Sequence, residues 1–219
     1  MAEPSTLVDS APPRLLVGAV YGNAFAIGAV IMGFEMLGSR YIYPYFGAGI
    51  GMWAALISMV LLALAIGYFV GGSLTTRHRS LRIVGMLVAV AAAYLSLVPL
   101  FADSAMLWIL DRFKAGAVGQ LAAAAGLTLI PLSLLGTLSP VGVAALSTFS
   151  KNSGATAGWL YGVSTVGNIA GVLLTTFVFV PTIGSRAITY GFACTLMASA
   201  GTLAAAERLF RGSEASKLN

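Results

Sequence analysis

The sequence predicts an all-α fold, a polytopic bundle of six transmembrane helices. Of its 219 residues, 58% are hydrophobic and only 9% are charged, whereas soluble domains carry about 25% charged residues. Several apolar runs reach the roughly 20 residues that a helix needs to cross a hydrocarbon core of about 30 Å. These runs are continuously apolar, while the strands of a membrane barrel alternate in hydropathy. We therefore expect an integral membrane protein whose main surroundings are the lipid bilayer.

The apolar runs divide the chain into three parts. We expect a polar cytoplasmic tail at residues 1–14, a six-helix domain at 15–206 and a charged cytoplasmic tail at 207–219. The expected spans are residues 15–37, 52–72, 81–101, 115–138, 157–180 and 187–206. Residues 102–116 mix apolar and charged side chains, which predicts a short interfacial helix. Residues 139–154 are expected to be a connector with a helical turn or two.

The distribution of basic residues predicts the orientation. Six spans place both termini on one side of the membrane. With the termini inside, the cytoplasmic segments would hold Arg14, Arg77, Arg79, Arg82, Lys151, Arg208, Arg211 and Lys217, against Arg40, Arg112, Lys114 and Arg186 outside. Cytoplasmic loops carry an excess of Lys and Arg. We therefore expect cytoplasmic termini and, for the whole chain, the cell inner membrane.

The composition argues against several classes of function. The formal charge of +5 is no sign of nucleic-acid binding, since the basic residues lie in short loops and tails without a clustered groove. The single histidine, His78, and the single cysteine, Cys194, leave no cluster for a metal ion or for nucleophilic catalysis. No glycine-rich cofactor motif stands outside the apolar runs. We expect no metal, no cofactor, no nucleic-acid partner and no enzymatic activity.

Glu35 is the only acidic residue within an expected span. A carboxylate at mid-helix costs roughly 2.5–3.5 kcal/mol on insertion scales and often marks an ion or substrate path. Glu35 lies about 20 residues past Leu15, or roughly 30 Å along a helix, which predicts a position at the outer boundary. Two interpretations stay open there. Either Glu35 forms an interfacial ion pair with Arg40 across a helix break at Gly38, or Glu35 is a carboxylate that handles a substrate or a proton.

Residues 41–53 alternate aromatic residues with turn residues and predict an aromatic loop between the first two spans. Tyr and Trp collect at membrane boundaries as anchors. Aromatic rings also attract a cation to their faces. Tyr41, Tyr45 and Trp53 are therefore either boundary anchors or the lining of a substrate mouth.

The expected fifth span contains a polar stripe. Tyr161, Ser164, Thr165 and Asn168 recur at steps of three and four residues, so they share one helical face. Hydrogen bonding between helices explains such a stripe. The other interpretation is the wall of a polar cavity, with Tyr161 and Asn168 as solute ligands.

An internal 3+3 repeat is a further hypothesis, since many transporters consist of two inverted halves. Residues 36–39 (MLGS) resemble residues 134–137 (LLGT), and Trp53 and Trp159 stand near corresponding helix starts. Chance similarity in a chain of this composition is the alternative.

Two adjacent motifs carry a family resemblance. Residues 35–53 read E-x4-R-x3-PYFG-x5-W, and residues 67–77 read GY-x2-GG-x-L-x2-R. With LGTLSP at 135–140 and IGSR at 183–186, this pattern resembles the transmembrane half of the membrane-bound spermidine synthase-like proteins, also described as fused major-facilitator/spermidine-synthase proteins. Thr76 stands where the comparable turn of major-facilitator transporters has an acid. The resemblance implies a membrane bundle and a soluble aminopropyltransferase-like protein as its partner.

Together these features predict a transporter-like protein for a small solute such as a polyamine or a related cation. Six spans can be half of a twelve-span transporter, so we expect a homodimer or larger homo-oligomer, or association with a separate synthase-like protein. The alternative is a non-catalytic subunit or anchor of a larger membrane complex. The candidate substrate-binding residues are Glu35, Arg40, Tyr41, Tyr45, Trp53, Tyr161 and Asn168.

Overall fold

The computed structural model describes residues 14–77, 80–150 and 152–217, and every element within these ranges is helical. Six helices are long and apolar enough to cross a membrane: Leu15–Phe46, Ile50–Thr75, Leu81–Phe113, Ala117–Ser147, Ser153–Thr182 and Ser185–Arg208. The prediction of an all-α bundle with six candidate spans is confirmed. The expected tail at residues 1–13 and the centre of the basic turn, residues 78–79, lie outside the described residues.

The helices follow one another with short connections. They are α1 (Arg14–Phe46), α2 (Ile50–Arg77), α3 (Leu81–Phe113), α4 (Ala117–Gly136), α5 (Leu138–Ser147), α6 (Ser153–Leu174), the π-helical turn η1 (Thr175–Phe179), α7 (Val180–Thr182) and α8 (Ser185–Lys217). Gly47, with φ of 75°, lies in the turn after α1, where a residue without Cβ is favoured. Asn152 caps α6, because its Oδ1 accepts a hydrogen bond from the Ala155 amide at 3.1 Å.

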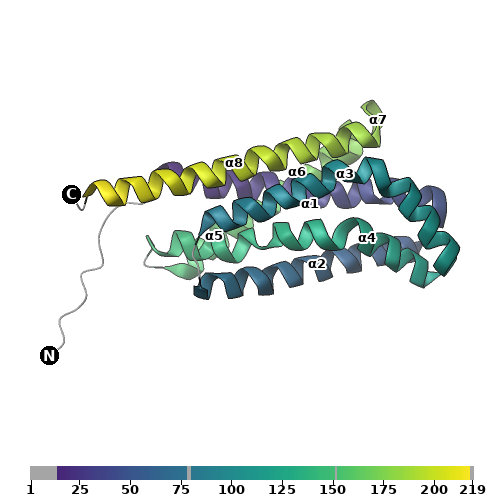
Figure 1. Ribbon diagram of the computed structural model, residues 1–219, viewed down its shortest axis with the longest axis horizontal. Helices are drawn as coiled ribbons and strands as arrows, with labels where there is room; N and C mark the ends of the chain where they lie inside the picture. The colour runs from purple at the N-terminus through teal and green to yellow at the C-terminus, as the bar shows by residue number, and fades with distance from the viewer. Residues whose placement is uncertain (1–13, 78–79, 151, 218–219) are drawn as a thin grey trace.

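Several boundaries differ from the sequence prediction. The prediction of an aromatic loop at residues 41–53 is wrong, because α1 continues through Gly38 and Pro44 to Phe46 and α2 begins at Ile50. The separate interfacial helix is also wrong, because residues 102–113 continue α3. The α3 ribbon turns sharply near its end (Figure 1), and Pro99 inside the helix supplies a reason, since proline removes a helical hydrogen bond. The connector contains the helix α5, and α8 extends through the expected tail to Lys217.

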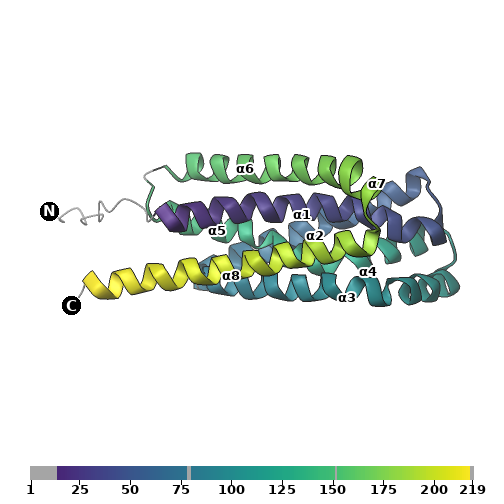
Figure 2. The same cartoon turned by 90° about the horizontal axis from the view of Figure 1, so that it is seen from above.

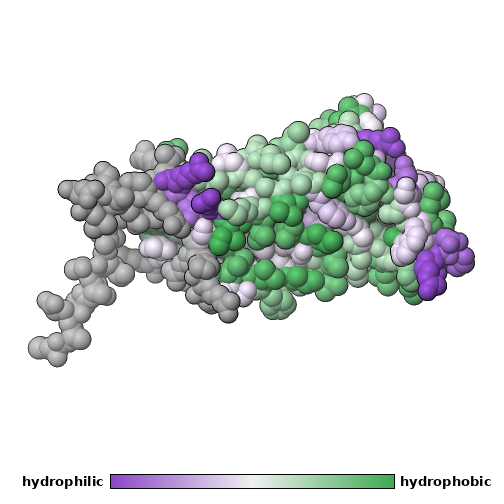
Figure 3. Space-filling view, viewed as in Figure 1, coloured by the Kyte–Doolittle hydropathy of each residue, from purple (hydrophilic) through white to green (hydrophobic). Residues whose placement is uncertain are grey.

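The bundle consists of three closely packed helix pairs. α1 packs most extensively on α6, α2 on α4 and α3 on α8, while α1 also contacts α8 and α3 contacts α4. Figures 1 and 2 show the long helices side by side, with the start of α1 and the end of α8 at the same end of the molecule. The surface in Figure 3 is mainly hydrophobic between more hydrophilic ends. This distribution fits a bundle surrounded by lipid.

Glycines bring two of these pairs together. A Cβ added to Gly67 or to Gly167 would collide with the backbone of the neighbouring helix. The same holds for Gly71, where the added atom would lie 2.8 Å from the Thr137 carbonyl oxygen, and for Gly171, where it would meet Ala29. Small residues permit such close backbone approach between membrane helices.

Polar contacts join α3 and α8 at both ends. Near the end of α8, the Glu207 carboxylate accepts hydrogen bonds from the Ser80 hydroxyl at 2.8 and 2.9 Å and from the Arg82 amide. At the other end, the Arg186 guanidinium pairs with Asp103 at 3.2 Å. The first contact is buried and the second is exposed. The two helices are thus fixed against each other along their length.

Candidate functional site

Glu35 lies inside the bundle and not at the end of a helix. Its side chain is buried, with 5% of the residue exposed, and α1 continues for about 16 Å beyond it, at 1.5 Å per residue. The predicted position beside a helix break is therefore wrong. Arg40 is exposed, and none of the described residues gives Glu35 an ion pair or a hydrogen bond. The predicted pair with Arg40 is not formed.

Two of the predicted aromatic residues connect helices. The Tyr41 and Thr189 hydroxyls form a buried hydrogen bond at 2.9 Å, which joins α1 to α8. The Tyr45 hydroxyl donates to the Asp103 carboxylate at 3.1 Å and joins α1 to α3. Neither side chain lines one of the two pockets described next, so both have structural roles here.

Arg40 and Trp53 line a surface groove of about 260 Å³ where α1 meets α2. The remaining lining residues are Ser39, Tyr43, Ala48 and Met52. A cation could approach the exposed Tyr43 ring and the partly exposed Trp53 ring. The guanidinium of Arg40 would repel the same cation. The groove thus contains two of the predicted residues, but its aromatic rings favour a cation while its arginine disfavours one.

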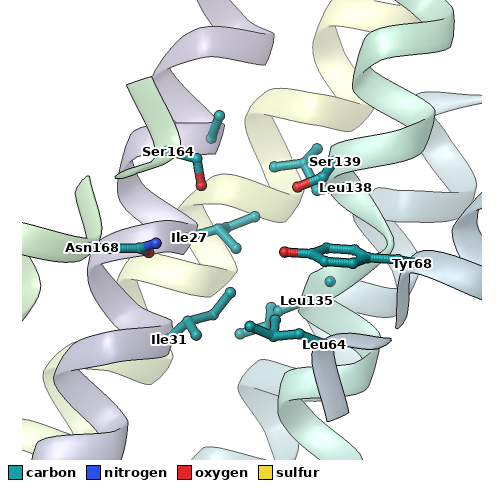
Figure 4. Close-up of a pocket in the computed structure, with 11 residues that line it drawn as sticks. Ile27, Ile31, Leu64, Tyr68, Leu135, Leu138, Ser139, Ser164 and Asn168 are labelled. Atoms are coloured by element: carbon teal, nitrogen blue, oxygen red, sulfur yellow. The ribbon is translucent and has the colours of Figure 1, made fainter. Parts of the chain in front are cut away.

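A smaller, more polar pocket lies within the bundle, between the α1–α6 pair and the helices α2, α4 and α5. Its lining residues are Ala24, Ile27, Ile31, Leu64, Tyr68, Leu135, Gly136, Leu138, Ser139, Ser164 and Asn168. In Figure 4 the Tyr68 hydroxyl points from one side toward Asn168 on the other, with Ile27 and Ile31 between them. The cavity volume is about 30 Å³, which suits about two water molecules.

Asn168 is the centre of this pocket's chemistry. Its Oδ1 atom is buried and has no hydrogen-bond partner among the described residues. Buried polar atoms are normally paired, and each exception needs an explanation such as a bound water or ion. Asn168 stands halfway along the span Ser153–Thr182, far from either end of that helix. The pocket is thus a hydrogen-bonding site in an otherwise apolar region.

The predicted polar stripe on α6 divides between two surroundings. Asn168 and Ser164 face α1, where a Cβ on Gly28 would lie 2.8 Å from Asn168 Oδ1 and 3.2 Å from Ser164 Oγ. Tyr161 and Thr165 are exposed, and the Thr165 hydroxyl donates to the Tyr161 carbonyl oxygen at 2.8 Å. The structure therefore brings Asn168 and Ser164 to the pocket and leaves Tyr161 outside it.

Sequence reasoning missed two polar residues of the pocket, Tyr68 and Ser139. Tyr68 lies well inside an apolar span, whereas tyrosines that anchor a helix collect at the boundary. That position was the available signal. No such signal exists in the sequence for Ser139, because this residue was expected in a connector, whereas it lies in α5.

The described residues bring together no group of three or more His, Cys, Asp or Glu side chains that could hold a metal ion. No family model, curated protein or solved structure matches the chain. The function is therefore inferred from the geometry of the bundle and its pockets, and the spermidine synthase-like resemblance stays a prediction.

Proposed function

We propose that this protein transports a small polar or cationic solute across the cell inner membrane, with the Asn168 pocket on the solute path. One observation supports the proposal above all. A buried oxygen without a partner lies halfway along an apolar helix, and polar groups inside membrane bundles commonly mark solute or ion pathways.

Glu35 extends the polar region along α1. Ile27 and Ile31 line the pocket, and Glu35 is the next residue of the same i, i+4 series, so it lies on that face of α1 one turn further on. A buried carboxyl group without a partner on this face can accept hydrogen bonds from a solute and, when ionised, can attract a positive charge. This arrangement supports a cation over an anion as the transported species.

Reconstitution into liposomes tests the proposal. Flux of radiolabelled methylammonium and of spermidine is measured in liposomes with the purified protein and in liposomes without it. We expect Glu35→Gln to reduce the flux at least tenfold, because the substitution removes the charge and keeps the shape. Thr165→Val, which changes an exposed residue of α6, is the matched control. Equal flux through Glu35→Gln and the parent protein would remove Glu35 from the mechanism.

A subunit or anchor role is the second candidate, and the exposure of α6 favours it. In the 18-residue apolar stretch that identifies the span Ser153–Thr182, only 17% of the stretch is buried, against 33–56% in the corresponding stretches of the other five spans. Trp159 and Phe177 are each 72% exposed. Such a face suits a second copy of this chain or another membrane protein. Purification in mild detergent followed by mass measurement separates the cases: a different protein at fixed stoichiometry would favour the subunit role over transport.

A further inference from the structure

We propose that the Asn168 pocket binds a primary ammonium group, and that it lies at the centre of an inverted repeat formed by the two halves of the chain. This inference rests on the proposed transport function for its biological role and deepens it by naming the chemical group. Its test measures binding and does not require transport.

The close contacts between α1 and α6 recur between α4 and α2. Gly28 approaches the carbonyl of Ser164, and Gly136 approaches the carbonyl of Leu64 in the same way. The contact of Gly167 with Phe25 matches that of Gly67 with Ser133. The contact of Gly171 with Ala29 matches that of Gly71 with Thr137. In all three contacts, the matching residues of α1 and of α4–α5 are separated by the same number of positions in the sequence. The same is true of the matching residues of α2 and α6. This regularity equates α1 with α4 and its continuation α5, and α6 with α2.

The two remaining long helices, α3 and α8, are related to each other in the same way. Arg186 at the start of α8 pairs with Asp103 of α3, and the Arg82 amide at the start of α3 pairs with Glu207 of α8. Residues 67–76 (GYFVGGSLTT) and 167–176 (GNIAGVLLTT) share two glycines, four residues apart, and the final LTT. Because α1 and α4 run in opposite directions along the bundle (Figure 1), the two halves are inverted, as in many transporters.

The pocket lies where the two halves meet. Eight lining residues form four equivalent pairs: Ile27 with Leu135, Ile31 with Ser139, Leu64 with Ser164, and Tyr68 with Asn168. Each half therefore supplies the same positions to one cavity. Transporters with inverted repeats bind their substrates at the interface of the repeats, near the middle of the membrane.

The lining offers several hydrogen-bond acceptors to a ligand that carries N–H groups. Asn168 Oδ1 lies against Gly28 of α1 and has no donor among the described residues, while the Nδ2 of the same amide can only donate. The hydroxyls of Tyr68, Ser139 and Ser164 can each accept as well. A primary ammonium group carries three N–H donors and a positive charge. It also has about the size of the water molecules for which the cavity has room.

Two cations of other chemistry provide the comparison. Tetramethylammonium has the same charge but no N–H donor, and it is too large for a cavity of about 30 Å³. Potassium is small enough but has no directional hydrogen bond. Potassium therefore tests the contribution of the N–H groups, and tetramethylammonium tests whether the ligand has to fit inside the cavity.

Calorimetric titration of the purified protein in detergent tests this inference, with ionic strength held constant by choline chloride. We expect methylammonium to bind at least tenfold more tightly than potassium, and tetramethylammonium not to bind. Asn168→Leu should weaken methylammonium binding at least tenfold, while Thr165→Val leaves it unchanged. Ser164→Ala, a smaller change, should weaken it about threefold and covers the case in which Asn168→Leu fails to fold.

The outcomes separate the site from the transport function. Equal affinity for potassium and methylammonium, or unchanged binding in folded Asn168→Leu, would overturn the ammonium site. Competition by spermidine would support the end of a polyamine as the ligand, and its absence would support a small free amine. Binding without flux in the liposome assay would retain the site and refute transport.

Discussion

The substitution Gly171→Ala tests the close packing on which the repeat depends. An added Cβ would lie 2.7 Å from both the carbonyl carbon and the Cα of Ala29, and a backbone cannot move aside as a flexible side chain can. Overpacking of this kind costs about 1–3 kcal/mol. Alanine in place of glycine in a helix returns up to about 1 kcal/mol. With the full gain subtracted, we expect a net loss of up to about 2 kcal/mol.

Gly162→Ala provides the control on the same helix. Its added Cβ would meet no atom within 4 Å, so only the helix-propensity gain of about 1 kcal/mol applies. Thermal unfolding in detergent should thus shift in opposite directions, with Gly171→Ala below and Gly162→Ala at or above the parent protein. For a chain of this length, 1 kcal/mol corresponds to about 2–4 °C. If both variants unfold at the same temperature, α6 does not approach α1 as closely as described.

The two contacts between α3 and α8 should differ in their energetic weight. Glu207→Ala leaves the buried Ser80 hydroxyl and the Arg82 amide without this acceptor, and we expect a loss of about 1–3 kcal/mol; a loss below 0.5 kcal/mol would contradict it. Arg186→Ala removes an exposed ion pair with Asp103, so we expect at most about 1 kcal/mol and a smaller effect in high salt. Denaturation by heat at two salt concentrations measures both.

The fold class could be predicted because lipid leaves few alternatives. Apolar runs of sufficient length in a chain with 9% charged residues have to form helices that satisfy their own backbone groups. The ends of the helices were less predictable. Pro44 and the glycines around it favour a turn in water-exposed sequence, yet α1 continues to Phe46. Contacts such as the Tyr41–Thr189 and Tyr45–Asp103 hydrogen bonds stabilise this extension, and they join residues far apart in sequence.

The candidate site was predicted only in part for the same reason. Asn168 belongs to a polar stripe that the periodicity of a helix reveals, but the same periodicity could not say which residues of the stripe face α1. Glu35 was singled out as the only acidic residue of an expected span, but it was expected at the outer boundary. It is buried inside the bundle, and its expected partner Arg40 is exposed. The place of Tyr68 in the site depends on α2 and α6 lying on opposite sides of one cavity, and the sequence does not reveal that arrangement.

The proposed repeat pairs the halves in a different register from the one that local sequence similarity suggests. MLGS and LLGT pair Gly38 with Gly136, whereas the proposed repeat pairs Gly136 with Gly28, because both glycines approach the backbone of a neighbouring helix in the same way. Packing constrains the residue that must lack a side chain at a helix crossing, while it places no such requirement on the residues beside it. Glycines whose added Cβ would meet a neighbouring backbone therefore carry the signal of the repeat, while glycines in open space, such as Gly162, carry none. On this argument the crossing glycines fix the register between the halves, and the register in turn places Tyr68 opposite Asn168.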